Sequence, residues 1–448
     1  MCPSAVGTNA CAIREPCQDP GAEKLRRNDF HAPKCGMISS VCGMVAARAA
    51  VVHLGEWVVM LTVRGGVPNV LLSLRRAQRL VPRRFRPRAK AVFNRALPRP
   101  WKRARVADSI RGQAQLCESL GSPLYARLLE GAARDVEEGG PCWSVLETAP
   151  PAPPGADEAL PLRFMAGVHR IVLGGRLPAL AAHFPSAGGT LEGDPWPPFL
   201  EAVTSHREEL SHELLRPLQT NEVTRCAALI GGFLTAAGLA RGGLRVLELG
   251  ASAGLNLNWD RYWYEGRDWS WGNPNSQVRF GSTFLSSPPP PRETVEVVER
   301  AGCDIAPLDP SSPDGPLVLE SFVWPDQIDR FKLLRAALEI ARRHPVRIDN
   351  ADACEWLAAQ LERSADGVVT LVFHSFFEHY LSDKGRRNLH ALVASAGRRA
   401  TKSSPLAHLR MEGGGHRADI EIVTWPGRQR QLLGAADNQV RSVRWLAH

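Results

Sequence analysis

None of the ten cysteines in this chain of 448 residues belongs to a Cys-x-x-Cys pair. This absence argues against the zinc and redox sites that use such pairs. Half of the cysteines lie in the first 42 residues, and the others are scattered singly among mostly apolar neighbours. Such spacing is typical of buried free thiols rather than of a disulfide framework. We therefore expect a reducing, cytoplasmic setting.

The sequence also lacks a long uninterrupted apolar run. Its most apolar early stretch, residues 37–63, is broken by Arg48, His53 and Glu56. A transmembrane helix needs about 20 consecutive apolar residues. The stretch also starts too late and has the wrong flanks for a secretory signal. We expect no membrane span.

Acidic residues are absent from residues 57–107, which contain 14 lysines and arginines. Because the net charge of the whole chain is +9, the remainder is net negative. Residues 83–105 could be a disordered basic arm, a tail for nucleic acid or membrane surfaces, or a segment without a folded role. We expect residues 1–105 to be a disordered or dispensable extension. Nucleic acid is not expected as a partner beyond nonspecific contact with this arm.

The remaining residues divide into two patterns. In residues 106–240, apolar residues recur at helical spacing, which predicts an all-helical cap domain. From Arg245, strands and helices alternate, and the chain ends in closely spaced strands without an intervening helix. This order predicts an α/β fold in residues 241–448, namely a doubly wound Rossmann-like sheet with an antiparallel C-terminal strand. Methyltransferase sheets end in this way.

The strongest local signal is the glycine-rich turn in residues 246–255 (VLELGASAGL). Gly250 and Gly254 permit a sharp turn from strand to helix, and the following helix would offer free N–H groups. Glu248 would point into the crevice at the carboxyl end of the strand. The pattern resembles the first motif of S-adenosylmethionine-dependent methyltransferases, with Ser252 where a glycine is usual. An ordinary strand–turn–helix corner is the alternative.

The same residues also spell Gly-x-Ser-x-Gly, the nucleophile elbow of α/β-hydrolases. Asp352, His374 and His416 follow as possible triad partners of Ser252. However, no His-Gly oxyanion motif precedes the turn, and the upstream region is helical where a hydrolase would already have strands. A serine hydrolase is therefore the third choice.

Two later strand ends carry candidate chemistry. Asp352 and Ala353 resemble the acidic-small pair that faces adenine in methyltransferases, although Asp352 would equally cap the next helix. His374 and Ser375 end a fully apolar strand, where His374 could serve as a general base. A structurally hydrogen-bonded histidine is the alternative. No further ligand cluster accompanies them, so we expect no metal. The aromatic residues 259–271 favour packing over a substrate lid.

Several blocks together resemble the bacterial domain of unknown function 2332 family, which is placed in the methyltransferase-like Rossmann superfamily. They are QTNEVTRCAAL (219–229), LELGASAGLNLNWDRY (247–262), WGNPNSQVR (271–279), GCDIAPLD (302–309), FVWPDQ (322–327), FHSFFEHYL (373–381), LRME (409–412) and TWPG (424–427). The resemblance covers about residues 108–445. It implies a methyltransferase-like fold more firmly than an activity.

The resemblance and the turn together imply a set of site residues. The cofactor would contact Glu248, Gly250, Ser252, Gly254, Asn256, Asp352 and Ala353. Catalysis would use His374 and Ser375, and the substrate pocket would include Asn221, Glu222, Arg225, Asp260, Tyr262, Trp324 and Gln327. The expected function is transfer of a methyl group from S-adenosylmethionine to an oxygen or nitrogen of a small molecule. A non-catalytic nucleotide-binding or regulatory protein on the same fold is the alternative.

Overall fold

The computed structural model describes residues 12–13, 48–54, 57–63 and 99–446, except 151–158, 240–241, 282–294, 415–416 and 438. The chain forms two compact units, residues 1–107 and 108–448. In the first unit, β1 (Ala12–Ile13), β2 (Arg48–Leu54) and β3 (Trp57–Val63) form an antiparallel sheet in the order β1-β3-β2. The disorder predicted for the basic arm before Arg99 lies outside the described residues.

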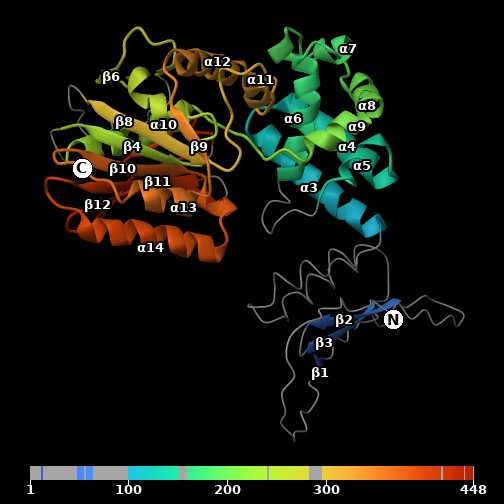
Figure 1. Ribbon diagram of the computed structural model, residues 1–448. Coiled ribbons are helices and arrows are strands. Elements are labelled where there is room, and N and C mark those ends of the chain that lie inside the picture. The colour runs from blue at the N-terminus through green and yellow to red at the C-terminus, as the bar shows by residue number, and fades with distance from the viewer. Residues whose placement is uncertain are drawn as a thin grey trace, which may run out of the picture. The chain divides into compact units, whose positions relative to one another are not determined.

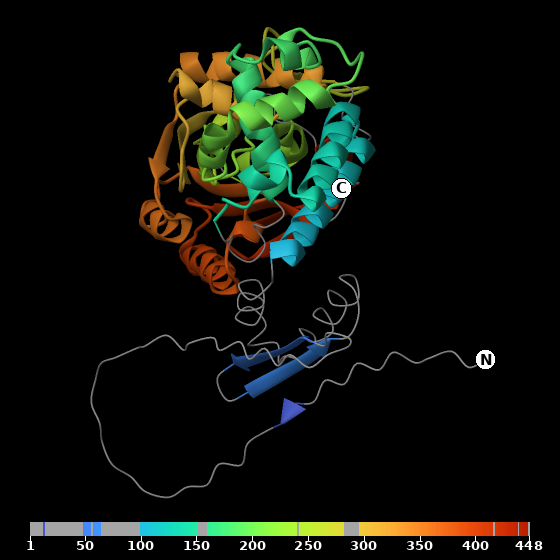
Figure 2. The same ribbon diagram turned by 90° about the vertical axis from the view of Figure 1, so that its right-hand side faces the viewer.

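The second unit begins with a helical segment, drawn in cyan and green in Figure 1 and seen in front of the sheet in Figure 2. A proline stands in the first turn of several of its helices, where a missing backbone N–H costs no hydrogen bond. The elements are α3 (Arg99–Ser119), α4 (Pro123–Glu138), α5 (Pro141–Leu146), α6 (Leu160–Leu173), α7 (Pro178–Ala181), η3 (Pro185–Ala187), α8 (Trp196–Ser205) and α9 (Arg207–Glu213). The next helix, α10 (Arg225–Ala237), lies against the sheet (Figure 1). The prediction that this segment forms a separate domain stays a prediction, because both parts lie within one unit.

An eight-stranded mixed sheet follows in the order β14-β13-β12-β11-β10-β4-β8-β9. The strands are β4 (Leu244–Leu249), β8 (Val297–Asp304), β9 (Arg347–Asn350), β10 (Val369–Ser375), β11 (Leu406–Gly414), β12 (Arg417–Trp425), β13 (Gln429–Ala436) and β14 (Val443–Trp445). Strands β9, β8, β4, β10 and β11 are parallel, and β12 to β14 continue as an antiparallel meander. The α/β class is thus confirmed.

Helices cover both faces of this sheet (Figure 1). Helices α10 and α12 (Ile328–Arg343) share one apolar core with Val246 and Phe373. Helices α13 (Ala353–Gln360) and α14 (Asp383–Arg399) share the other with Leu247 and Val372. Every side chain of β4 and β10 is buried, as expected for strands between two helical layers. A further helix, α11 (Asp314–Ser321), precedes α12.

The order of the strands creates a switch point beside β4. The chain runs from β4 outward to β8 and β9, and then returns to place β10 and β11 on the other side of β4. In open α/β sheets, ligands bind outside the carboxyl ends of the strands at such a point. The carboxyl ends of β4 and β10 therefore locate the region where a site is expected.

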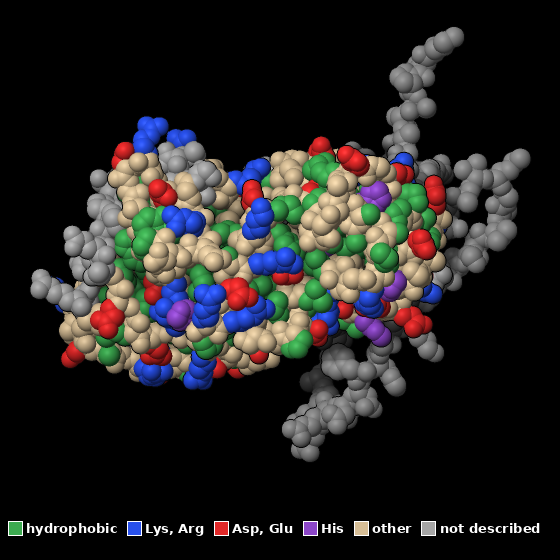
Figure 3. Space-filling model, turned by 90° about the horizontal axis from the view of Figure 1, so that it is seen from above, with side chains coloured by type: hydrophobic (Ala, Val, Ile, Leu, Met, Phe, Trp, Pro, Cys, Tyr) green, Lys and Arg blue, Asp and Glu red, His purple; other side chains and the backbone are tan. Residues whose placement is uncertain are grey.

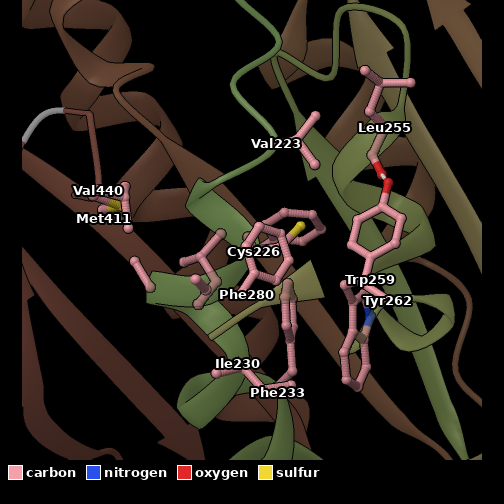
Figure 4. Packing of buried hydrophobic residues seen from close by; sticks show 14 of the residues in the cluster. Val223, Cys226, Ile230, Phe233, Leu255, Trp259, Tyr262, Phe280, Met411 and Val440 are labelled. Carbon is pink, nitrogen blue, oxygen red and sulfur yellow. Dashed lines mark hydrogen bonds between the residues drawn. The ribbon is translucent and has the colours of Figure 1, made fainter. Parts of the chain in front are cut away.

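The α-helix predicted after Gly254 is instead a short 3-10 segment, η4 (Leu255–Arg261), with a kink at Asn258. A small sheet follows, made of β5 (Trp263–Glu265), β6 (Ser270–Gly272) and β7 (Arg279–Phe280). The reason is packing, because Trp259 is fully buried between Phe233, 4.4 Å away by ring centroids, and Trp271, 5.2 Å away. Figure 4 shows Trp259 beside Phe233 of α10 and the Tyr262 hydroxyl bonded back to η4.

The surface seen in Figure 3 intersperses basic, acidic and apolar side chains. Of the helices that the structure describes, none has the length and apolar character needed to cross a membrane.

Candidate functional site

The glycine turn uses its own backbone donors. The N–H groups of Gly250 and Ala251 donate to the carbonyl of Cys303, and that of Gly254 donates to Ala251. The N–H of Ser252 donates to Asp304 Oδ2 (2.9 Å). Those of Ala253 and Leu255 donate to Asn221 Oδ1 at 3.3 and 3.1 Å. Each N–H from residue 250 to residue 255 thus has a partner within the protein.

The turn glycines serve close packing. Gly250 and Gly254 have φ values of 69° and 71°, which favour glycine. A Cβ atom at Gly250 would lie 2.7 Å from the ring of Phe377, and one at Gly254 would lie 2.5 Å from Val346. The space beside each glycine is therefore filled by a side chain of the protein.

The segment of residues 219–225 holds the turn in place. The Ser252 hydroxyl donates to Gln219 Oε1, and Gln219 Nε2 donates to the carbonyl of Ala306 (2.9 Å). At the other end of the segment, Arg225 Nη1 donates to the carbonyl and the hydroxyl of Ser375 at 3.2 and 3.3 Å. Segment 219–225 therefore connects the carboxyl ends of β4, β8 and β10.

Glu248 lies at the centre of this region and is only 2% exposed. Its Oε1 accepts a long hydrogen bond from Asn256 Nδ2 (3.4 Å), and its Oε2 has no partner. Burial raises the pKa of Glu248 well above its ordinary value, because the low-dielectric interior disfavours the charged carboxylate. The neighbouring Cys226 thiol contacts Asn256 Oδ1 (3.2 Å), and burial also raises its pKa.

Asp304 was not predicted as a site residue. It ends β8 directly beside the turn and is partly exposed. Its Oδ2 binds the N–H of Ser252, and its Oδ1 accepts from the N–H of Ala306 (2.9 Å). The block GCDIAPLD (302–309) contains this acid, but only β8, which ends at Asp304, shows that it lies beside the turn.

His374 is fully buried and points away from Ser375. Its Nδ1 lies 2.7 Å from Glu412 Oε1, an oxygen that also accepts from the N–H groups of Phe377 (2.9 Å) and Glu378 (3.2 Å). Because that oxygen is an acceptor, Nδ1 of His374 is the donor. Its Nε2 lies 3.1 Å from Nε2 of His408, whose pKa is well below the ordinary value because of burial. Both ring nitrogens of His374 are thus engaged inside the protein.

A charged network continues from this histidine around Glu378. Its Oε1 lies 2.8 Å from His390 Nε2 and 3.1 Å from Arg410 Nη1. Burial opposes ionisation, but the hydrogen bond with His390 and the charges of His374, His390 and Arg410 bring the pKa of Glu378 to about 2. Among the described residues, no three or more histidine, cysteine or acidic side chains converge as a metal site would require.

The hydrolase interpretation can be compared with the geometry of Ser252. Its φ of 53° is unusual, but its hydroxyl donates to Gln219 rather than to a histidine. Asp352 accepts from the N–H groups of Cys354 (2.9 Å) and Glu355 (3.2 Å) and caps α13. His416 lies outside the described residues.

The other predicted residues occupy separate places. Asp260 pairs with Arg300 (2.8 Å), and Tyr262 is buried and bonded to the carbonyl of Leu255. Ala353 belongs to the core beneath α13. Gln327 Nε2 donates to the carbonyl of Leu120 (3.1 Å), which joins α12 to the helical segment.

A cavity of ≈ 200 Å³ lies beside Arg225 within residues 108–448. Glu222, Arg225 and Trp324 line it, as predicted substrate residues, together with Arg330 and others that were not predicted. Glu222 Oε2 pairs with Arg330. Although burial alone would raise the pKa of Glu222, this ion pair lowers it below the ordinary value. The cavity therefore contains fixed charges, and one of them, Arg225, contacts the carboxyl end of β10.

The region that holds the sheet, the turn and the cavity also carries the similarity to known sequences. Residues 107–445 match the model of a family described as an uncharacterized protein conserved in bacteria (DUF2332). The chain belongs to this family. No curated protein and no solved structure matches it. The DUF2332 match includes Asp304 and the whole of segment 219–225, and β1 to β3 precede it.

Proposed function

We propose that the chain is a methyltransferase-like Rossmann protein that binds S-adenosylmethionine at the carboxyl ends of β4 and β8 and methylates an oxygen or nitrogen of a small molecule. One observation carries the proposal. The glycine turn follows the central strand at the switch point, and Asp304 ends the neighbouring strand. In Rossmann folds, an acid near this position binds the ribose hydroxyls of the nucleotide.

The residues of the site fit one part of this cofactor better than the other. Asp304 is partly exposed, so its carboxylate can accept a hydrogen bond from a ribose hydroxyl. The turn offers no unused N–H groups, and Phe377 lies against Gly250. The nucleoside part therefore fits, whereas the amino-acid part requires Phe377 to move.

When bound, the cofactor supplies an activated methyl group, and the chain's own residues would orient the acceptor. Arg225 and Glu222 face the cavity where an acceptor would lie. His374 is bonded to Glu412 on the face of the sheet opposite to Ser375 and Arg225. We therefore assign His374 to positioning the segment 376–378 rather than to proton transfer at the acceptor.

The test is calorimetric titration of the full chain with S-adenosylmethionine and S-adenosylhomocysteine. We expect micromolar binding to the wild type, weakened at least about tenfold in Asp304→Asn, because hydrogen bonds to charged groups are the strong ones. Gly250→Asp should abolish binding. The matched control is Asp383→Asn, an exposed acid at the start of α14. A folded wild type that binds neither ligand would overturn the proposal.

A non-catalytic binding or regulatory protein is the second candidate, favoured by the satisfied N–H groups of the turn. Binding of the cofactor without methyl transfer to any member of a small-molecule panel would select it. For a serine hydrolase, labelling of Ser252 by a fluorophosphonate is the decisive test. We expect no labelling, since the hydroxyl is buried and bonded to Gln219.

A further inference from the structure

Arg225 differs from the other arginines of the cavity. Arg330 pairs with Glu222, and Arg441 Nε lies 3.6 Å from Asp437 Oδ2. Arg225 donates Nη1 to Ser375 and stacks on the ring of Phe376 at 5.0 Å, but in the described part of the chain it forms no ion pair. Its Nε is buried without a hydrogen-bond partner. The cavity thus contains a guanidinium group that forms no direct ion pair with the described residues.

The acids nearest to Arg225 cannot serve as that anion. Glu222 is held by Arg330, and Glu412 is held by His374 and two backbone N–H groups. Glu248 is bonded to Asn256 rather than to Arg225, and burial disfavours its charged form by raising its pKa well above the ordinary value. Burial also lowers the pKa of Arg225, yet a guanidinium stays charged in proteins. A partly desolvated cation without a counter-ion is unfavourable, so an incoming anion would be stabilised there.

Apolar side chains form much of the rest of the cavity lining. They belong to the helical segment and to the approach to α12, namely Leu116, Leu120, Tyr125, Leu162, Ala166, Phe322 and Trp324. An apolar cavity of about 150 Å³ is large enough for benzene. A volume of ≈ 200 Å³ therefore suits a ring or short chain that carries one small polar group.

We propose that this cavity binds a small carboxylic acid with an apolar body. The carboxylate would contact the guanidinium of Arg225, which lines the cavity, because hydrogen bonds between a guanidinium and a carboxylate are strong. The body would lie against Trp324 and Tyr125. This binding does not depend on a methyl donor. Only the assignment of such an acid as a methyl acceptor rests on the proposed function.

The test is calorimetric titration of the full chain with benzoate, with benzamide as the neutral analogue and inorganic phosphate as a second anion. We expect benzoate to bind at least about tenfold more tightly than benzamide and more tightly than phosphate. Arg225→Gln should weaken benzoate binding by the same factor. Arg335→Gln removes an exposed arginine of α12 outside the cavity and should leave the affinity unchanged.

A second variant keeps the proposal testable if Arg225→Gln does not fold. Ala166→Leu fills the apolar end without removing a charge, and it should also weaken benzoate binding. The proposal would be overturned if the wild type did not bind benzoate, bound benzamide equally well or bound phosphate more tightly. Full benzoate affinity in a folded Arg225→Gln or Ala166→Leu chain would also overturn it. Asp304→Asn should leave benzoate binding intact. Failure of the nucleotide site and failure of the cavity are therefore distinguishable.

Discussion

His374 and Ser375 are consecutive residues of β10, yet their side chains leave the sheet on opposite faces. His374 bonds to Glu412 and His408, whereas Ser375 accepts from Arg225. Side chains alternate along a strand, so this division is built into the backbone. The strand therefore connects a buried histidine network on one face to the cavity arginine on the other.

Removing the acceptor of the histidine network should destabilise the protein. Glu412→Ala leaves Nδ1 of His374 and the N–H groups of Phe377 and Glu378 without their shared oxygen. We expect the free energy of unfolding in urea to fall by about 3 kcal/mol. Glu412→Gln retains an oxygen and should lose less. Equal losses in the two variants would contradict this role. The control is Glu339→Ala, at an exposed position of α12.

Gly250 and Phe377 should be energetically coupled. Gly250→Ala adds a Cβ that meets the ring of Phe377 at 2.7 Å, in a left-handed conformation that itself costs about 1–2 kcal/mol. In a Phe377→Ala background only the conformational cost remains, so the same substitution should destabilise the chain less. A double-mutant cycle measures the difference. If the two substitutions changed the free energy of unfolding additively, the ring of Phe377 would not restrict the side chain at position 250.

Glu248 and Glu222 should change the stability of the protein with pH in opposite directions. The pKa of Glu248 is raised in the folded state. Glu248 therefore lowers the free energy of unfolding once the pH exceeds the pKa of a glutamate in the unfolded chain, about 4.3. Glu248→Gln should therefore stabilise the protein at pH 7 by about 1 kcal/mol or more, and the gain should disappear near pH 4.

Glu222→Gln provides the contrasting case. The pKa of Glu222 is lowered by Arg330, so its stabilisation is present above the unfolded value and is lost as pH falls. This variant should destabilise the protein at pH 7 by about 3 kcal/mol. Urea unfolding between pH 4 and pH 8 checks both signs, and two variants that shift in the same direction would refute the assignment.

Asp352→Ala separates the two interpretations of that residue. As the cap of α13, Asp352 accepts two backbone N–H groups, and its loss should cost about 1 kcal/mol of stability. We expect unchanged affinity for S-adenosylmethionine, or for any ligand of the cavity. A tenfold loss of nucleotide affinity with unchanged stability would instead assign Asp352 to the adenine site.

A helix or strand could be predicted from the sequence wherever its own residues, without distant contacts, favoured one conformation. Strand β10 (VTLVFHS) is largely apolar, which marks a strand buried between two helical layers, and β4 (LRVLEL) is short, mostly apolar and followed by a glycine turn. The 3-10 segment after Gly254 could not be predicted, because it depends on Trp259 stacking between Phe233 and Trp271 from other parts of the chain.

The site was predictable only in part for the same reason. Gly302 lies against the turn, because an added Cβ there would lie 2.6 Å from Ala251, a contact between residues 51 positions apart that the sequence does not show. The alternation of β10 already separates His374 from Ser375. Their partners Glu412 and Arg225 lie 38 and 150 residues away, which no local pattern reveals.

The central position of β4 has a consequence for the order in which the protein can fold during its synthesis. Helix α10 and β4 are translated well before β10, but α10 packs on β10 to β12, and one edge of β4 pairs with β10. Until Val369–Ser375 has been translated, that edge and the apolar face of α10 have no partner. Unpaired edges and exposed apolar surface favour aggregation. The nascent chain therefore needs protection until β10 to β12 have been translated, and the centre of the sheet cannot assemble before then.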